Sequence, residues 1–236
     1  MRVLLRVFVI VLGVIVLLAT VGLGWVFFYS RDLPDINALA EFAPFQVMLV
    51  SDPCLKTTSV AVPHDLIGNN LRAALQAAEG GEESPGVLAQ EYRGDLKSPR
   101  GSVLSRQIAR SMFCEPSKTL NRELKELRMA VQLERRFSGP DLFTIFANRA
   151  WFSKDLVGVE AASQHFFRKE PNQLQIGEAA LLAGLLRAPS RFSPYEHPDR
   201  ALQRRNEVID AMVEGQTISE SQGEVAKATG LGVGTR

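Results

Sequence analysis

The first pattern along the chain is an unbroken apolar run near the N-terminus. The residues from Val7 to Tyr29 include no charged side chain. A helix needs about 20 apolar residues to cross roughly 30 Å of hydrocarbon. The run therefore predicts a transmembrane helix over residues 7–29.

The flanks of this run indicate its fate and its direction. Aromatic residues stand where it ends: Trp25, Phe27, Phe28 and Tyr29. They suit a membrane interface, whereas a cleaved signal peptide, the alternative, has an apolar core of roughly 7–15 residues and small residues at its cleavage site. Arg2 and Arg6 precede the run. The positive-inside rule then predicts a cytoplasmic segment 1–6, a single pass through the plasma (inner) membrane, and residues 31–236 on the extracytoplasmic, periplasmic side.

Residues 30–59 combine turn-forming residues with short extended runs. Pro34 and Pro44 fall in a stretch that we expect to be a juxtamembrane linker. Val47–Val50 and Thr57–Val62 are apolar, β-branched runs on either side of an Asp-Pro turn. Such runs predict a small hairpin or extended pair.

Beyond these runs the pattern has a helical period. Apolar residues recur at intervals of three and four in residues 64–81, 117–139, 174–190 and 199–215. In the second segment Ser117 or Thr119 can cap the start and Gly139-Pro140 stops the helix. Its apolar residues form one stripe: Leu120, Leu124, Leu127 and Val131. The segment 174–190 is apolar on nearly every side, which predicts a central helix, so we expect one mainly α domain.

Composition narrows the classes of partner and cofactor. The 236 residues carry 27 basic and 26 acidic side chains, a formal net charge of +1. No nucleic-acid partner is expected from a chain whose charges are so balanced.

Cys54 and Cys114 are an even pair in the exported part, where a disulfide and two separate buried thiols both remain open. Neither cysteine has ligands at metal-binding spacing, so no metal site is expected.

Two glutamates are the candidates for chemistry. Glu79 ends an Ala-rich apolar helix and precedes a Gly-rich acidic loop, where a carboxylate can project into a cleft. Glu126 follows Arg122 by four positions, a spacing that is more often a solvated ion pair than a site. The three histidines form no triad pattern with a Ser or Cys nucleophile. The residues alone thus lead to an anchored helical domain with two candidate carboxylates.

A series of segments in fixed order resembles a known family. The segments are VPHDLIGNNLRAALQAAE, RGSVLSRQIARSMF, TLNRELKELRMAVQLERRFS, IFANRAWF, GVEAASQHFFRK, IGEAALLAGLLRAPSRFSP and RALQRRNEVIDAM. They are similar to successive blocks of the peptidoglycan glycosyltransferases (glycosyltransferase family 51), which occur as monofunctional transglycosylases or as the first domain of class A penicillin-binding proteins. The resemblance covers residues 60–222 and leaves 223–236 as a tail. It implies a lysozyme-like α fold with a membrane-facing hydrophobic lobe, and a transferase that polymerises lipid II into glycan strands in cell-wall synthesis.

The resemblance also implies roles for individual residues. Glu79 matches the glutamate taken as the base that deprotonates the acceptor's 4-hydroxyl, which attacks the anomeric carbon of the lipid-pyrophosphate donor with inversion. Glu126 matches the second family glutamate, which lies near the leaving pyrophosphate. The positions that match the family's lipid II-binding residues are Ser102, Gln107, Arg110 and Arg122. A divalent cation, Mg²⁺ or Mn²⁺, would accompany the substrate, and the implied partners are lipid II, glycan strands, the membrane and other cell-wall synthesis proteins.

The chain departs from the family pattern at several site positions. The replaced family residues are an Asp at Gly80, a His at Ser84, a Thr at both Val103 and Ser105, a Gln at Arg106 and a Lys at Glu123. Two interpretations therefore remain open: a working polymerase, or a catalytically degenerate relative that binds lipid II, glycan strands or a synthesis partner as a scaffold. The chain contains no Ser-x-x-Lys and no Lys-Thr-Gly sequence, so no transpeptidase site is expected in it.

Overall fold

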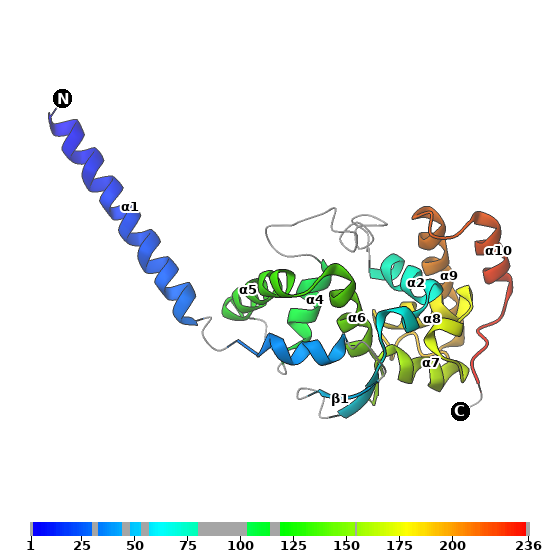
Figure 1. The fold of residues 1–236 in the computed structure, drawn as a ribbon. Helices are drawn as coiled ribbons and strands as arrows, with labels where there is room; N and C mark the ends of the chain where they lie inside the picture. Colours follow the sequence, from blue (N-terminus) through cyan, green and yellow to red (C-terminus); the bar gives the residue numbers. More distant parts are fainter. Residues whose placement is uncertain are drawn as a thin grey trace.

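A computed structural model of the chain describes residues 2–29, 33–43, 48–52, 57–79, 103–113, 119–153 and 155–234 (Figure 1). The elements are α1 (Arg2–Tyr29), η1 (Ile36–Phe42), β1 (Met48–Asp52), β2 (Thr57–Ala61), η2 (His64–Ile67), α2 (Asn69–Glu79), α4 (Val103–Ser111), α5 (Leu120–Arg136), α6 (Gly139–Arg149), β3 (Trp151–Ser153), β4 (Leu156–Val157), α7 (Val159–Phe167), η3 (Pro171–Gln173), α8 (Ile176–Leu185), α9 (Pro198–Glu214) and α10 (Glu220–Ala228). The predicted mainly α class is confirmed.

The N-terminal apolar run forms one long helix. Helix α1 extends away from the domain (Figure 1), and its side chains from Phe8 to Trp25 are exposed. The window Phe8–Trp25 has a mean hydropathy of 2.6. The helix is thus long and apolar enough to cross a membrane. The predicted helix is therefore confirmed. Its crossing of a membrane stays a prediction, since a signal sequence near the N-terminus can also meet this criterion of length and hydropathy.

Two small antiparallel sheets accompany the helices. Strands β1 and β2 pair with Met48 opposite Ala61 and Asp52 opposite Thr57, which confirms the predicted hairpin. Strands β3 and β4 form a second, irregular pair. This pair was not predicted, because only Phe152 of β3 is buried and its two exposed neighbours give too short an alternation to detect.

The segment expected to be a plain linker is partly folded onto the domain. Helix η1 begins at the cap Asp35, whose carboxylate accepts the Asn37 amide at 2.8 Å. Leu39 and Phe42 are 1% and 2% exposed, so this helix contributes to the core. Three-residue spacing places both side chains on one face of a 3-10 helix, which explains how so short an element is anchored.

The centre of the domain is α8, as predicted from its apolar surface. Its residues Ala179 to Leu185 are all buried, and it packs against α2 and α9 (Figure 1). Gly184 permits this approach, because a Cβ there would lie 3.0 Å from Arg204 Cγ of α9.

The fully buried Arg205 of α9 donates to the carbonyls of Lys227, Thr229 and Gly230 at the end of α10. Helix α10 therefore continues the packed domain across residue 222, where the resemblance ended.

Helix α5 forms as predicted but faces the core with a different side. Thr119 caps its start, and Gly139-Pro140 opens the next helix, α6, behind the cap Ser138. The buried residues are Met129, Ala130 and Leu133. The apolar stripe of Leu120, Leu124, Leu127 and Val131 lies roughly 140° away around the helix, and Leu120 is 79% exposed. The stripe is thus not the face that packs against the core. The face that does so also carries an ion pair, and the hydrophobic pattern of the sequence therefore does not identify it.

Candidate functional site

An arginine–glutamate cluster joins α4 to α5 and contains three of the predicted site residues. Arg122 Nε donates to Glu126 Oε1 at 2.7 Å, one helical turn away. Arg110 Nε of α4 lies 3.5 Å from Glu126 Oε2. The structure therefore brings Arg110, Arg122 and Glu126 together, with two cations on one carboxylate.

Burial divides the members of the cluster into two kinds. Arg122 and Glu126 have side chains only 12% and 13% exposed, whereas Arg110 is 74% exposed. Interpreting Arg122 and Glu126 as a solvated surface pair is therefore wrong. A buried carboxylate is stable when charged partners satisfy it. Arg122 supplies that partner, which leaves Arg110 as the cation that faces solvent and can meet an anion.

Two arginines hold the C-terminal end of α4 in place. Arg122 donates to the Arg110 carbonyl at 3.2 Å and lies over the Phe113 ring at 5.2 Å. Arg149 of α6 donates to the Ser111 carbonyl at 3.2 Å and lies over the Phe42 ring at 4.9 Å. Cations suit these last carbonyls because they carry the negative end of the helix dipole. Arg149 was missed by sequence reasoning, since nothing local marks its contact with a helix 38 positions earlier.

Helix α4 positions Gln107 and Arg110 through its buried face. Leu104, Ile108 and Met112 are spaced by four and are nearly inaccessible. The fully buried Ser105 donates to Glu134 Oε1 of α5 at 3.0 Å, a second polar tie between the helices. Gln107 is half-buried on the same helix. The replacement of a family Thr at Ser105 thus keeps a hydroxyl that serves packing.

The remaining predicted site residues fall at the edge of the described chain. Helix α2 ends at Glu79, and its buried Leu71, Ala74 and Leu75 fix the path of the helix backbone. The Glu79 side chain, Ser102 and both cysteines, for which a disulfide and two separate thiols are both open, lie outside the described residues. The role of Glu79 and the state of Cys54 and Cys114 therefore stay predictions.

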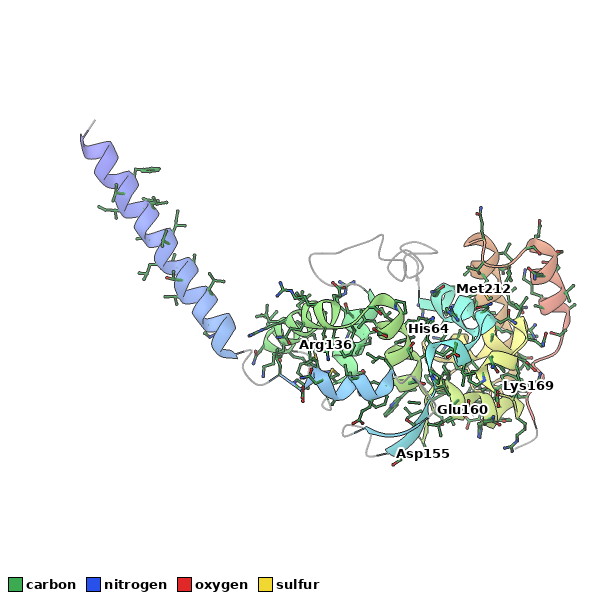
Figure 2. The ribbon with its side chains drawn as sticks, in the orientation of Figure 1. His64, Arg136, Asp155, Glu160, Lys169 and Met212 are labelled. Atoms are coloured by element: carbon green, nitrogen blue, oxygen red, sulfur yellow. The ribbon has the colours of Figure 1, made fainter. Side chains whose placement is uncertain are left out.

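Among the described residues, a carboxylate with a shifted pKa lies outside this cluster. Burial raises the pKa of the Glu160 carboxyl on α7, while the hydrogen bond from Gln164 acts in the opposite direction. Figure 2 shows Glu160 well apart from Arg136, the last residue of α5. The hydrogen bond of Glu160 is to Gln164 on its own helix, whereas the members of the cluster lie on α4 and α5.

A metal ion held by the protein does not fit the described part of the cluster. Both carboxylate oxygens of Glu126 already contact a guanidinium. Within the described ranges, no group of three His, Cys, Asp or Glu side chains comes together.

Comparison with known proteins finds a protein family whose model matches the part of the chain that carries this cluster. The family described as Transglycosylase matches residues 86–213, more than half of the chain. This match includes every predicted site residue except Glu79.

Individual relatives agree with the family match. The chain is 38% identical over 135 residues to penicillin-binding protein 1A of Aquifex aeolicus, covering 57% of this chain and 19% of that protein. It is 35% identical over 156 residues to penicillin-binding protein 1F of Bacillus subtilis, covering 65% and 22%. The chain thus spans about a fifth of the length of these relatives. A crystal structure of penicillin-binding protein 1A from Haemophilus influenzae shares 22% identity and a TM-score of 0.39 over 56% of this chain and 17% of that one. On the family match, this chain belongs to the transglycosylase family.

Proposed function

We propose that the chain is a membrane-anchored peptidoglycan glycosyltransferase that polymerises lipid II into glycan strands. The observation that carries the proposal is the cluster on α4 and α5, in which a buried Arg122–Glu126 pair holds the exposed Arg110 beside it. Family membership supplies the reaction class, and the cluster supplies a cation for the charge that such a reaction develops.

The reaction assigns a separate task to each end of the site. Glu79 accepts the proton of the acceptor's 4-hydroxyl, since an alcohol with its ordinary pKa is a poor nucleophile without a base. The hydroxyl oxygen bonds to the anomeric carbon of the donor as the bond from that carbon to the pyrophosphate oxygen breaks, with inversion. The lipid pyrophosphate leaves with its negative charge facing Arg110, and any divalent cation comes bound to that pyrophosphate.

Glu126 acts in this scheme by placing cations. Its carboxylate fixes Arg122 over Phe113 and lies within 3.5 Å of the Arg110 guanidinium. Cations that are held in place before the reaction stabilise developing charge without rearranging during it. The buried pair is therefore the support, and Arg110 is the group that meets the pyrophosphate.

The anchor determines where this reaction takes place. Helix α1 holds the domain at a membrane, and Arg2 and Arg6 keep the N-terminus in the cytoplasm. The domain then faces the extracytoplasmic side, where it meets lipid II, growing glycan strands and other synthesis proteins.

One observation favours the second candidate, a degenerate relative that binds lipid II or glycan without polymerising it. Glu123 is exposed in the first turn of α5, next to Arg122 in the sequence. A carboxylate at this place repels a pyrophosphate. Such a chain would bind its ligand and leave it unchanged.

Replacing Glu123 by Lys is expected to raise the polymerisation rate about threefold, a size typical of exposed charge interactions. The substitution turns repulsion of the leaving group into attraction. The measurement is the initial rate with labelled lipid II and detergent-solubilised full-length protein.

The control variant is Glu214→Lys, which makes the same change of charge at an exposed position on α9. It should leave the rate at the wild-type value. An equal rise in both variants would show a general charge effect, and an unchanged rate in Glu123→Lys would remove the pyrophosphate from this cluster.

A further inference from the structure

A polar pocket lies on α5, on a different side from the arginine–glutamate cluster. It has a volume of about 450 Å³ and is lined by residues 33–36 on one wall and by Arg128, Gln132 and Arg135 of α5 on the other. Sites for small molecules commonly measure roughly 300–1,000 Å³. The pocket is thus large enough for a small polar group.

The α5 wall of the pocket has the chemistry of an anion site. Arg128, Gln132 and Arg135 are spaced by four and three, so they share one helix face. Two guanidinium groups and an amide offer planar sets of N–H donors that match phosphate oxygens.

The opposite wall holds one carboxylate, and its bonds are accounted for. Asp35 Oδ1 accepts hydrogen bonds from the Asn37 backbone amide at 2.8 Å and from Asn37 Nδ2 at 2.9 Å. Asp35 therefore acts as the cap of η1. Among the described residues that line the pocket, two arginines stand against one aspartate, so basic side chains outnumber acidic ones.

The chain places this pocket close to the end of the apolar helix. Leu33 in the pocket wall follows Tyr29, the last residue of α1, by only four positions. An extended chain covers at most about 3.6 Å per residue, which limits this separation to roughly 14 Å. Figure 1 shows α5 at the end of the domain to which α1 connects. If α1 spans the bilayer, the pocket lies at the level of the lipid headgroups or just outside them.

The neighbouring surface of α5 favours a lipid over a free ion. The apolar stripe borders the arginine face of α5, roughly 80° away around the helix. Leu120 is 79% exposed, and Leu124, Leu127 and Val131 are only partly buried. A phosphate that carries glycerol and acyl chains can contact both the arginines and these side chains, whereas inorganic phosphate uses the arginines alone.

We propose that this pocket binds the phosphate of an anionic glycerophospholipid at the membrane surface. Arg128 and Arg135 hold the phosphate oxygens, Gln132 adds an N–H donor, and the bound headgroup fixes the linker against α5. The proposal rests on the anchoring of the chain by α1. The pocket is separate from the reaction site, because Arg128 lies about 200° around the helix from Glu126.

The test is native mass spectrometry of the full chain in neutral detergent with short-chain phosphatidylglycerol. We expect one bound lipid, with an affinity about tenfold lower in Arg135→Gln and in Arg128→Gln, as for the loss of a charge-assisted hydrogen bond. The matched control is Arg136→Gln, which removes the same charge from the next residue. Arg136 lies over the Phe137 ring and is not among the described residues that line the pocket. The affinity of the Arg136→Gln variant for phosphatidylglycerol should therefore stay within twofold of wild type.

Four outcomes would overturn the proposal. Equal losses in Arg135→Gln and Arg136→Gln would reduce the effect to surface charge. No loss in either would show that Arg135 does not hold the headgroup. Equally tight binding of short-chain phosphatidylcholine would remove the requirement for an anionic headgroup. Full competition by inorganic phosphate at the same concentration would assign the pocket to the free ion. The intact mass in the same spectra reports whether α1 is retained, and polymerisation is scored separately, so failure of the anchor or of the proposed function is recognised independently.

Discussion

Replacing Glu79 by Gln is expected to lower the rate of lipid II polymerisation by about two to four orders of magnitude, the range for loss of a general base. Glutamine keeps the size of the side chain but cannot accept the proton of the acceptor hydroxyl. Binding of lipid II should change little, because the loss falls on the transition state. The measurement is the initial polymerisation rate at saturating lipid II, beside a separate binding titration.

The control for this variant is Glu83→Gln, an identical change four positions later in the same acidic stretch. It should polymerise at the wild-type rate. The fold should survive in both variants, since the buried anchors of α2 are Leu71, Ala74 and Leu75. Polymer made by Glu79→Gln at the wild-type rate would refute the assignment of the base.

Replacing Asn148 by Ala is expected to destabilise the domain by about 3–5 kcal/mol, because buried polar groups that lose their partners cost about 1–3 kcal/mol each. Asn148 is fully buried on α6 and links three segments. Its Oδ1 accepts the Val62 amide at 3.0 Å, and its Nδ2 donates to the carbonyls of Phe42 and Val62 at 2.8 and 2.9 Å. A loss of this size lowers the unfolding midpoint by roughly 10 °C in a chain of this length.

Thermal unfolding of the wild-type protein and of Asn148→Ala in the same detergent measures this shift of the unfolding midpoint. The matched control is Asn121→Ala on α5, where the side chain is only partly buried. Its midpoint should stay within about 2 °C of wild type, as for most surface substitutions. A midpoint equally close to wild type in Asn148→Ala would show that the three hydrogen bonds do not hold these segments together.

The sequence predicts those elements of the fold whose pattern is local. The apolar runs of α1 and α8 and the β-branched runs of β1 and β2 each contain their own signal. The orientation of α5 has no such signal, because the stripe of four apolar residues is clearer in sequence than the mixed face of Met129, Ala130 and Leu133 that the fold buries. Asn148 and Arg205 likewise read as ordinary polar residues, since their partners lie tens of positions away.

Three residues that the structure brings together, Arg110, Arg122 and Glu126, were named from the sequence, but their organisation was not. The four-residue spacing of Arg122 and Glu126 suggested a pair, and the family resemblance added Arg110. That the pair is buried depends on α4 packing against α5, which no local pattern encodes. The tie from Arg149 to Ser111 and the pocket of Arg128 and Arg135 arise from the same kind of long-range contact.

The most direct measurement of the central claim is the product formed when wild-type protein meets its proposed substrate. Full-length protein in neutral detergent is incubated with labelled lipid II and either Mg²⁺ or Mn²⁺, and the products are separated by gel electrophoresis. The account predicts glycan strands longer than the disaccharide unit, and none at the same time point with Glu79→Gln. Bound lipid II without any polymer under either ion would contradict the account and leave the chain as a non-catalytic relative.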